Sequence, residues 1–225
     1  MSREEHTISI VEDLLTRGRS LYDQLLLKYP STDLRPVFVA SIGNALRSYH
    51  LFFAMVVSTI THESWWQQQF GLTQLRDLER GAIGNLDKTT RFAFFVFVLS
   101  QVEWSMRKLV THISPGACGN GGASFKSVYD HVFTKLGLMA YIPLYDLCRN
   151  VRNSVHSNAT YINKDGKDIQ ITWKELDYKF KHLQPVDFMT YDFTLALYGD
   201  LLDSIEAIMA HPLVTTPSVM QDGFA

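Results

Sequence analysis

Apolar residues recur at spacings of three and four over most of the chain, which is the pattern of amphipathic and buried α-helices. The pattern covers residues 5–29 and resumes, after a capping signal, up to about residue 61. Four further helical segments follow at 87–112, 124–136, 142–159 and 187–210. Together these segments hold well over half of the chain, against the roughly one-third of an average globular protein. The sequence therefore predicts an all-α protein, a bundle of about six helices.

Between the last two helices the apolar pattern changes from a helical to an extended period. The β-rich runs 159–163 and 168–173 flank a glycine-containing turn signal at 164–167. We expect a small β-hairpin insert near 160–181, in which 173–181 is a third strand or an extended return.

The remaining segments connect these elements without dividing the chain. Residues 62–86 mix polar, aromatic and glycine residues, which predicts an irregular or short helical connection. No stretch rich in proline, glycine or serine separates two domains, so we expect residues 1–212 to form one domain. Residues 213–225 lack periodicity, and we expect them to form a flexible tail.

The charge balance narrows the classes of function. The chain has 21 basic and 23 acidic residues and a formal net charge of −2. This balance argues against a protein that coats nucleic acid or anionic lipid through its overall charge, although it leaves room for a small basic patch. No apolar run approaches the about 20 residues of a membrane span. We therefore expect a cytoplasmic protein that does not enter a membrane.

Cysteine and histidine usage gives no sign of a bound metal. The two cysteines, Cys118 and Cys148, can supply neither a disulfide framework nor a four-thiolate zinc site, and they suit a reducing compartment. The histidines are scattered, without a pair at metal-ligand spacing. We expect neither a metal nor a cofactor.

The segment 142–159 carries the clearest candidate chemistry. At 100° per residue, one side of this helix is apolar and consists of Leu144, Leu147, Cys148, Val151 and Val155. The opposite side groups Arg149, Arg152, Asn153 and His156 within about 60° of one another. Tyr145 is expected to border this polar stripe, and Asp146 to point elsewhere, so that few acids neutralise it.

Two arginines one turn apart repel each other on an isolated helix, so this face needs an anionic partner. If carboxylates of a neighbouring helix supply it, the face is an ordinary solvated, salt-bridged surface. Alternatively, guanidinium groups bind phosphate oxygens and a histidine moves a proton near neutral pH. Such a set can cleave RNA without a metal. His156 would assist the attacking 2′-hydroxyl or the leaving 5′-oxygen, and the arginines would stabilise the charged phosphorane.

The run Arg152-Asn153-Ser154-Val155-His156, with Arg149 just upstream, resembles the signature of the HEPN superfamily. In that signature four to six residues separate an arginine from a histidine. Arg149 and His156 have six residues between them and fit, whereas Arg152 and His156 have three. Which arginine occupies the signature position therefore stays open.

The order of elements extends the resemblance. An Arg/His helix, a short β insertion and a final helix are similar to the plasmid-encoded HEPN group named for pEK499. By that comparison residues 87–210 are the HEPN core, and the helix that carries Glu103 and Arg107 is its opening helix. Residues 1–61 would be additional N-terminal helices.

The resemblance implies a metal-independent endoribonuclease that serves as a toxin or a phage-defence effector. Two protomers would bring their Arg/His helices together around a shared cleft, and cleavage would leave a 2′,3′-cyclic phosphate and a 5′-hydroxyl. The implied catalytic residues are Arg149, Arg152, Asn153 and His156. The implied partners are RNA, a second copy of the chain and a cognate antitoxin or regulatory protein.

Two alternatives remain. The family contains inactive members, so the chain is alternatively a catalytically silent HEPN module whose polar face binds a protein partner or a nucleotide. A third hypothesis is an antitoxin-like or scaffold protein in which the helices within residues 1–61 carry the interaction.

Overall fold

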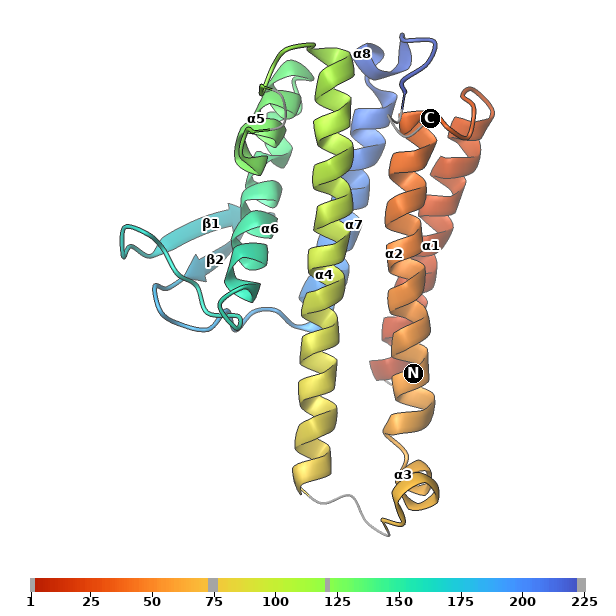
Figure 1. The fold of residues 1–225 in the computed structure, drawn as a ribbon, viewed down its shortest axis with the longest axis vertical. Helices are drawn as coiled ribbons and strands as arrows, with labels where there is room; N and C mark the ends of the chain where they lie inside the picture. Colours follow the sequence, from red (N-terminus) through yellow and green to blue (C-terminus); the bar gives the residue numbers. More distant parts are fainter. Residues whose placement is uncertain (1–2, 73–76, 120–121, 222–225) are drawn as a thin grey trace.

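The structure, a computed structural model, describes residues 3–72, 77–119 and 122–221. These residues form eight α-helices and one two-stranded antiparallel sheet (Figure 1). In chain order the elements are α1 (Arg3–Leu26), α2 (Leu34–Met55), a π-helical turn η1 (Val56–Ile60), α3 (Glu63–Phe70), α4 (Asp77–Ile113), α5 (Phe125–Lys135), a 3-10 turn η2 (Met139–Tyr141), α6 (Ile142–Val155), β1 (Ile169–Trp173), β2 (Leu176–Phe180), α7 (Tyr191–Ala210) and α8 (Pro212–Thr215). The predicted all-α class with a small hairpin insert is confirmed. Six of the helices correspond to the six predicted segments.

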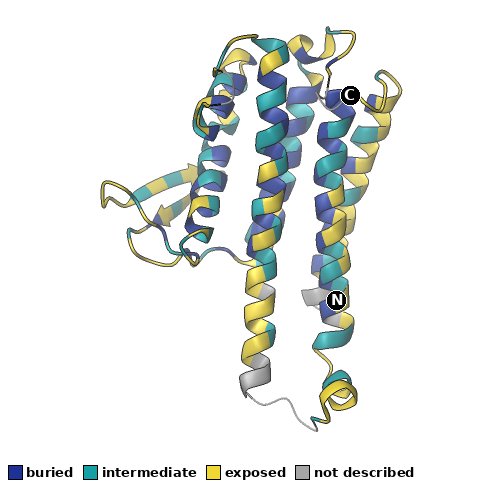
Figure 2. Ribbon diagram, viewed as in Figure 1, coloured by how far each residue is buried: buried dark blue, intermediate teal, exposed yellow. Residues whose placement is uncertain are grey.

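The long helices α1, α2, α4 and α7 run alongside one another, and α5 and α6 flank α4 (Figure 1). Helix α1 packs against α2 and α7, and α4 packs against α2, α5 and α6. One cluster of buried apolar side chains draws members from all six of these helices, among them Val11, Phe38, Phe95, Val132 and Leu144. Each such side chain contributes about 1.5–3 kcal/mol when fully buried. Buried positions line the inside of the bundle, whereas residues 81–86 of α4 are mostly exposed (Figure 2).

Helix α4 begins earlier than the sequence pattern predicts. The pattern starts this helix at residue 87, but the structure starts it at Asp77, so that Gly81 and Gly84 lie inside it. Each glycine costs about 1 kcal/mol relative to alanine in a helix interior. The continuous backbone hydrogen bonding of this 37-residue helix outweighs that cost. The predicted irregular or short helical connection over 62–86 is therefore confirmed for the short helix α3 and corrected for residues 77–86, which belong to α4.

The hairpin pairs different segments of the chain from the predicted ones. Strand β1 pairs with β2, with Trp173 opposite Leu176, and the turn consists of Lys174 and Glu175 with φ of 47° and 64°. Two consecutive positive φ angles define a type I′ turn, for which asparagine and glycine are the usual signal. Because neither residue is of that type, the sequence pattern placed the hairpin turn at 164–167. A turn does occur there, in which Gly166 N donates to Asn163 O at 3.1 Å, but it precedes β1 and does not join the two strands. The predicted strand or extended return at 173–181 contains β2.

The run 159–163, predicted as the first hairpin strand, lies outside the sheet. Its only bridge in the described residues joins Thr160 to Pro185. The hairpin is instead fastened to the bundle through Asp200 of α7, which is only 6% exposed. Its carboxylate accepts hydrogen bonds from Trp173 Nε1 at 2.5 Å and from Lys174 Nζ. These bonds hold the strained turn against α7.

The C-terminal segment is packed where the sequence predicts a flexible tail. Residues 212–221 include the short helix α8, and both Val214 and Met220 are completely buried. Gln221 bridges to Asp33, and Met220 O accepts a hydrogen bond from Leu34 N at 2.8 Å. The prediction is therefore corrected for 213–221, while the last four residues lie outside the described chain. The pattern missed this packing because a buried irregular segment has no periodicity.

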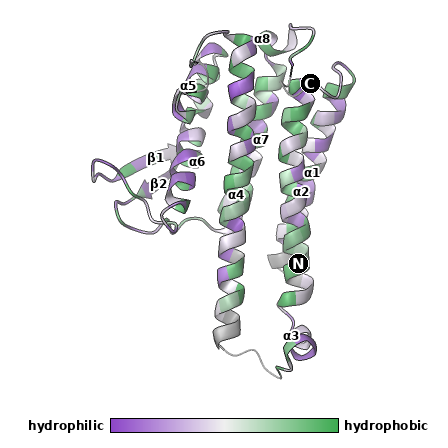
Figure 3. Cartoon of the chain, viewed as in Figure 1, coloured by the Kyte–Doolittle hydropathy of each residue, from purple (hydrophilic) through white to green (hydrophobic). Residues whose placement is uncertain are grey.

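Apolar and polar residues alternate along the long helices, and apolar residues are prominent along α2 (Figure 3). Within the described ranges, no helix combines the length and apolar character needed to cross a lipid bilayer.

Candidate functional site

Helix α6 is amphipathic, as predicted, and its apolar side lies in the core. Pro143 occupies the first turn, where a missing N–H costs nothing. Leu144, Leu147, Cys148 and Val151 are all completely buried. Burial raises the pKa of the Cys148 thiol well above its ordinary value, so this cysteine stays a neutral core side chain.

Tyr145 belongs to the core and does not border the polar stripe. It is completely buried, and its hydroxyl lies 2.9 Å from Ser204 Oγ on α7. Burial also raises the pKa of Tyr145. The prediction failed because the helical position alone does not show that α7 covers this side of α6.

The four predicted site residues lie together on the outward side of α6. Arg149 and Arg152 are partly buried, and Asn153 and His156 are exposed. The helix ends at Val155, so His156 is its C-terminal capping residue and the predicted end at 159 is too late. By helical rise, Arg149 and His156 are about 10 Å apart along the axis, with Arg152 between them.

Arg152 is neutralised by a carboxylate from α4. Glu103 accepts hydrogen bonds from Arg152 Nη1 and from Arg107, whose Nε lies 3.1 Å from Glu103 Oε1. Arg107 also donates to the carbonyl of Ala123 at 2.9 Å. The guanidinium of Arg152 lies 5.7 Å from the centre of the Phe125 ring, within the range of a cation–π contact. Helices α4, α5 and α6 therefore all hold Arg152 in place.

Arg149 is held less tightly than Arg152. Its Nη2 atom comes only to 3.9 Å from Asp146 Oδ1, which is beyond hydrogen-bond length. That carboxylate already accepts hydrogen bonds from Tyr129 Oη at 2.5 Å and from Lys126 Nζ at 3.1 Å. Hydrogen-bonding capacity is therefore left on the Arg149 guanidinium.

The expectation of an acid-poor face is wrong. Asp146 lies beside Arg149 at the i, i+3 spacing, and Glu103 reaches the face from another helix. The contact between Asp146 and Arg149 could be predicted from the sequence, because residues three positions apart on a helix are neighbours. The contact of Glu103 depends on how α4 packs against α6. Sequence reasoning also missed Lys126 and Tyr129 of α5, for which no pattern signals a place in this network.

Each of the two arginines has one buried donor atom without a hydrogen-bond partner in the described residues. The Nε atoms of Arg149 and Arg152 are buried and have no hydrogen-bond partner within the described part of the chain. A buried unpaired donor of a charged group is costly. Because these two Nε atoms are buried, an anion from solvent would meet the exposed part of each side chain instead, which is 29% for Arg149 and 22% for Arg152. The face therefore combines two partly unsatisfied guanidiniums with an exposed amide and an exposed imidazole.

Glu103 makes the stability of this region depend on pH. Burial would raise its pKa, but hydrogen bonds from Arg107 and Arg152 lower the pKa below its usual value. A lowered folded-state pKa stabilises the fold above the unfolded value of about 4.3, and this contribution is lost as pH falls through the folded value. We expect Glu103→Gln to lose less stability than the wild type between pH 5 and pH 3, by at most about 1.4 kcal/mol per pH unit.

Thermal unfolding between pH 7 and pH 3 measures this difference. Glu12→Gln, at an exposed position of α1, is the matched control and should follow the wild-type profile. If the stability of Glu103→Gln falls with pH in parallel with that of the wild type, Glu103 does not contribute to the pH dependence of stability.

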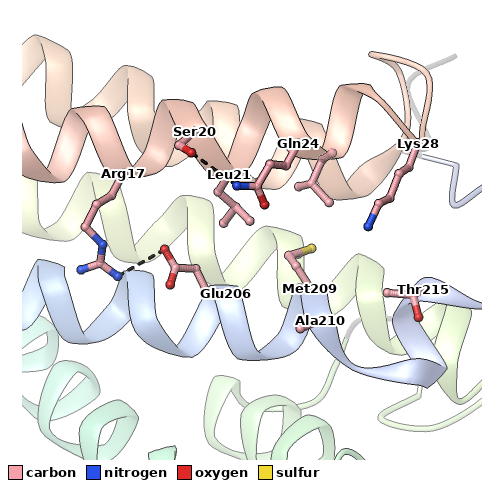
Figure 4. Close-up of a pocket in the computed structure, with 10 residues that line it drawn as sticks. Arg17, Ser20, Leu21, Gln24, Lys28, Glu206, Met209, Ala210 and Thr215 are labelled. Atoms are coloured by element: carbon pink, nitrogen blue, oxygen red, sulfur yellow. Dashed lines mark hydrogen bonds and ion pairs between the residues drawn. The ribbon is translucent and has the colours of Figure 1, made fainter.

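A separate groove of about 550 Å³ lies between α1 and α7 (Figure 4). Its Arg17 is paired with Asp203 at 2.7 Å and with Glu206 at 3.2 Å. Gln24 donates to Ser20 at 3.4 Å. None of the four predicted site residues lines this groove, so it is not part of the candidate site.

In the described residues, no group of three or more His, Cys, Asp and Glu side chains is placed to hold a metal ion. No protein-family model, curated protein or solved structure matches this chain.

Proposed function

We propose that this protein is a metal-independent endoribonuclease of the HEPN type. The observation that supports the proposal is the placement of Arg149, Arg152, Asn153 and His156 on the outward side of α6. Arginine supplies the fork that matches phosphate oxygens, and histidine supplies a proton-transfer group. Cleavage of an RNA phosphodiester needs both, together with access from solvent.

In the proposed reaction the ribose 2′-oxygen attacks the adjacent phosphorus, and the bond to the 5′-oxygen breaks. The attacking hydroxyl gives its proton to a base, and the leaving oxygen takes a proton from an acid. His156 fills one of these roles, because imidazole both accepts and donates protons near neutral pH. Arg149 and Arg152 stabilise the charge that develops on the phosphorane, and Asn153 orients the RNA. The products are a 2′,3′-cyclic phosphate and a 5′-hydroxyl.

The proposal includes a homodimer with a composite site. One His156 cannot be base and acid in the same step, whereas two facing α6 helices provide both roles. Pairing also doubles the local positive charge of a chain whose net charge is −2. We further propose a cytoplasmic toxin or phage-defence effector that is restrained by a cognate antitoxin or regulatory protein, since unrestrained RNA cleavage would harm its host.

One observation favours a second candidate, a catalytically silent HEPN-like module. Glu103 of the same chain already pairs with Arg152, and Asp146 lies beside Arg149. In that case the face would exchange charges with a protein partner or bind a nucleotide. The two candidates differ in whether RNA is cut.

The proposal predicts RNA cleavage that survives removal of divalent metals. The purified chain is incubated with a labelled single-stranded RNA in the presence of excess EDTA, and the product ends are identified. We expect cleavage at an undiminished rate, with 2′,3′-cyclic phosphate and 5′-hydroxyl ends. An absence of cleavage, or cleavage only after a divalent ion is added, would overturn the proposal, and uncut RNA would favour the silent module.

A further inference from the structure

A second groove lies at the C-terminal end of α6. It has a volume of about 550 Å³ and separates the N-terminal half of α4 from the turn that follows α6. The residues that line it include Asn85, Lys88, Thr89, Phe92, Val155 and Asn158. Val155 and Asn158 lie within two residues of His156 in the chain, so the groove is close to the end of α6 that carries His156, although none of the four predicted site residues lines it.

The groove combines an apolar floor with a polar rim. Phe92 is buried to 9% exposure and Val155 is partly buried, whereas Asn85, Lys88 and Thr89 are exposed. The α4 residues of the groove are spaced three and four positions apart, so they share one face of that helix. Among the described residues, Lys88 has no ion-pair partner. An apolar floor with amide, hydroxyl and ammonium groups at its edge suits a nucleobase with a phosphate beside it.

The wall that follows α6 has strained backbone. Asn158 and Ala159 have φ of 54° and 61°, in the left-handed region. Asparagine adopts this region more readily than other non-glycine residues, so the strain lies at Ala159. Ala159 is held there because its carbonyl accepts a hydrogen bond from Val186 N at 2.8 Å. Strain of this kind costs about 1–3 kcal/mol per residue and collects at ligand sites. The turn fixes the Asn158 amide at the groove, two residues from His156.

We propose that this groove binds one nucleotide of single-stranded RNA next to the phosphate that is cut. The base lies over the apolar floor, its edge meets the amides of Asn85 and Asn158, and Lys88 contacts an adjacent phosphate. The inference rests on the proposed ribonuclease function, since His156 marks the neighbouring phosphate. It accounts for how a chain without a net positive charge holds RNA: through one shaped pocket, with little contribution from bulk attraction.

The test measures binding separately from cleavage. The full chain carrying His156→Ala is titrated with a 5′-fluorescein 12-nucleotide single-stranded RNA, and the fluorescence anisotropy gives Kd at several salt concentrations. In this background Lys88→Ala should raise Kd about tenfold, because a charge-assisted contact is lost. The slope of log K against log salt should also fall by about 0.7 for the missing phosphate contact.

Two further variants complete the test. Asn158→Gly keeps the left-handed backbone and removes only the amide, and we expect about a fivefold rise in Kd, as for one lost hydrogen bond. Lys28→Ala removes an exposed lysine distant in sequence from the groove and should leave Kd within about twofold. Unfolding curves of each variant confirm that the fold is retained.

The outcomes separate the groove from the ribonuclease. If the wild type cuts RNA, but Lys88→Ala and Asn158→Gly bind RNA with the same Kd as the His156→Ala parent, the proposed nucleotide site is wrong and the ribonuclease proposal stands. If the wild type does not cut RNA, but RNA binding depends on Lys88 and Asn158, the ribonuclease proposal is wrong and the proposed nucleotide site stands. If the His156→Ala parent does not bind the RNA, the proposed nucleotide site is also wrong.

Discussion

Replacement of His156 by alanine is expected to lower the rate of RNA cleavage by a factor of about 10²–10⁴, the usual effect of losing a general acid or base. The imidazole is exposed at the end of α6 and belongs to none of the buried clusters. Its removal should therefore change the free energy of unfolding by less than about 0.5 kcal/mol. Single-turnover cleavage of a labelled RNA, together with thermal unfolding of the same preparations, measures both effects.

A matched histidine and a conservative variant sharpen this prediction. His62 is also exposed but lies at the start of α3, and His62→Ala should cleave RNA at the wild-type rate. His156→Gln retains a polar side chain that cannot transfer a proton at neutral pH, so it should be as inactive as His156→Ala. A His156→Ala protein that cuts RNA within threefold of the wild-type rate would remove His156 from the mechanism.

The substitution Asp33→Ala is expected to lower the free energy of unfolding by about 3–5 kcal/mol, the cost of breaking a buried ion pair. Asp33 and Arg35 are both completely buried. The Asp33 carboxylate accepts hydrogen bonds from Arg35 Nε at 2.7 Å and Nη2 at 2.6 Å, and from Met220 N at 2.8 Å. Its removal leaves the guanidinium without a counter-ion. It also removes the N-terminal cap of α2, because Asp33 Oδ1 accepts a hydrogen bond from Arg35 N at 3.0 Å.

Arg35 explains why the effect should reach the C-terminal segment. Its Nη1 donates to the carbonyls of Val214 at 2.9 Å and Pro217 at 3.0 Å, and its guanidinium lies 3.3 Å from the centre of the Tyr29 ring. The ion pair thus joins the α1–α2 connection to residues 212–221. In Asp33→Ala we expect this segment to be cut first by a protease under native conditions.

Urea unfolding of Asp33→Ala and wild type gives the change in stability. Arg17→Ala is the control: it breaks an ion pair with Asp203 in which both side chains are more than 40% exposed, and it should cost at most about 1 kcal/mol. Unfolding of Asp33→Ala within 1 kcal/mol of wild type would show that the buried pair is not a major source of stability.

Helical segments were predictable because their signal is local. Apolar residues three and four apart mark a face that must be covered, so α1, α2, α5, α6 and α7 were located to within a few residues. The extension of α4 through Gly81 and Gly84 was not predictable. Glycine lowers the helical signal, whereas the helix continues because its backbone hydrogen bonds do not depend on side chains.

The hairpin and the C-terminal segment show the limit of such patterns. The turn at Lys174 and Glu175 has no turn-forming composition, and the bonds from Asp200 that hold it come from α7. The burial of Val214 and Met220 likewise depends on a distant arginine, Arg35. Contacts between residues far apart in the chain leave no periodic trace in either segment.

The sequence by itself determined that Arg149, Arg152, Asn153 and His156 share one side of a helix, because helical geometry sets the direction of each side chain. Only the tertiary structure decided what surrounds them. Packing of α4 against α6 brings Glu103 to Arg152 and leaves Arg149 more weakly paired, and packing of α7 buries Tyr145. A helix specifies its own faces, whereas the charge that each face meets comes from other helices, whose approach is set by the fit of the whole core.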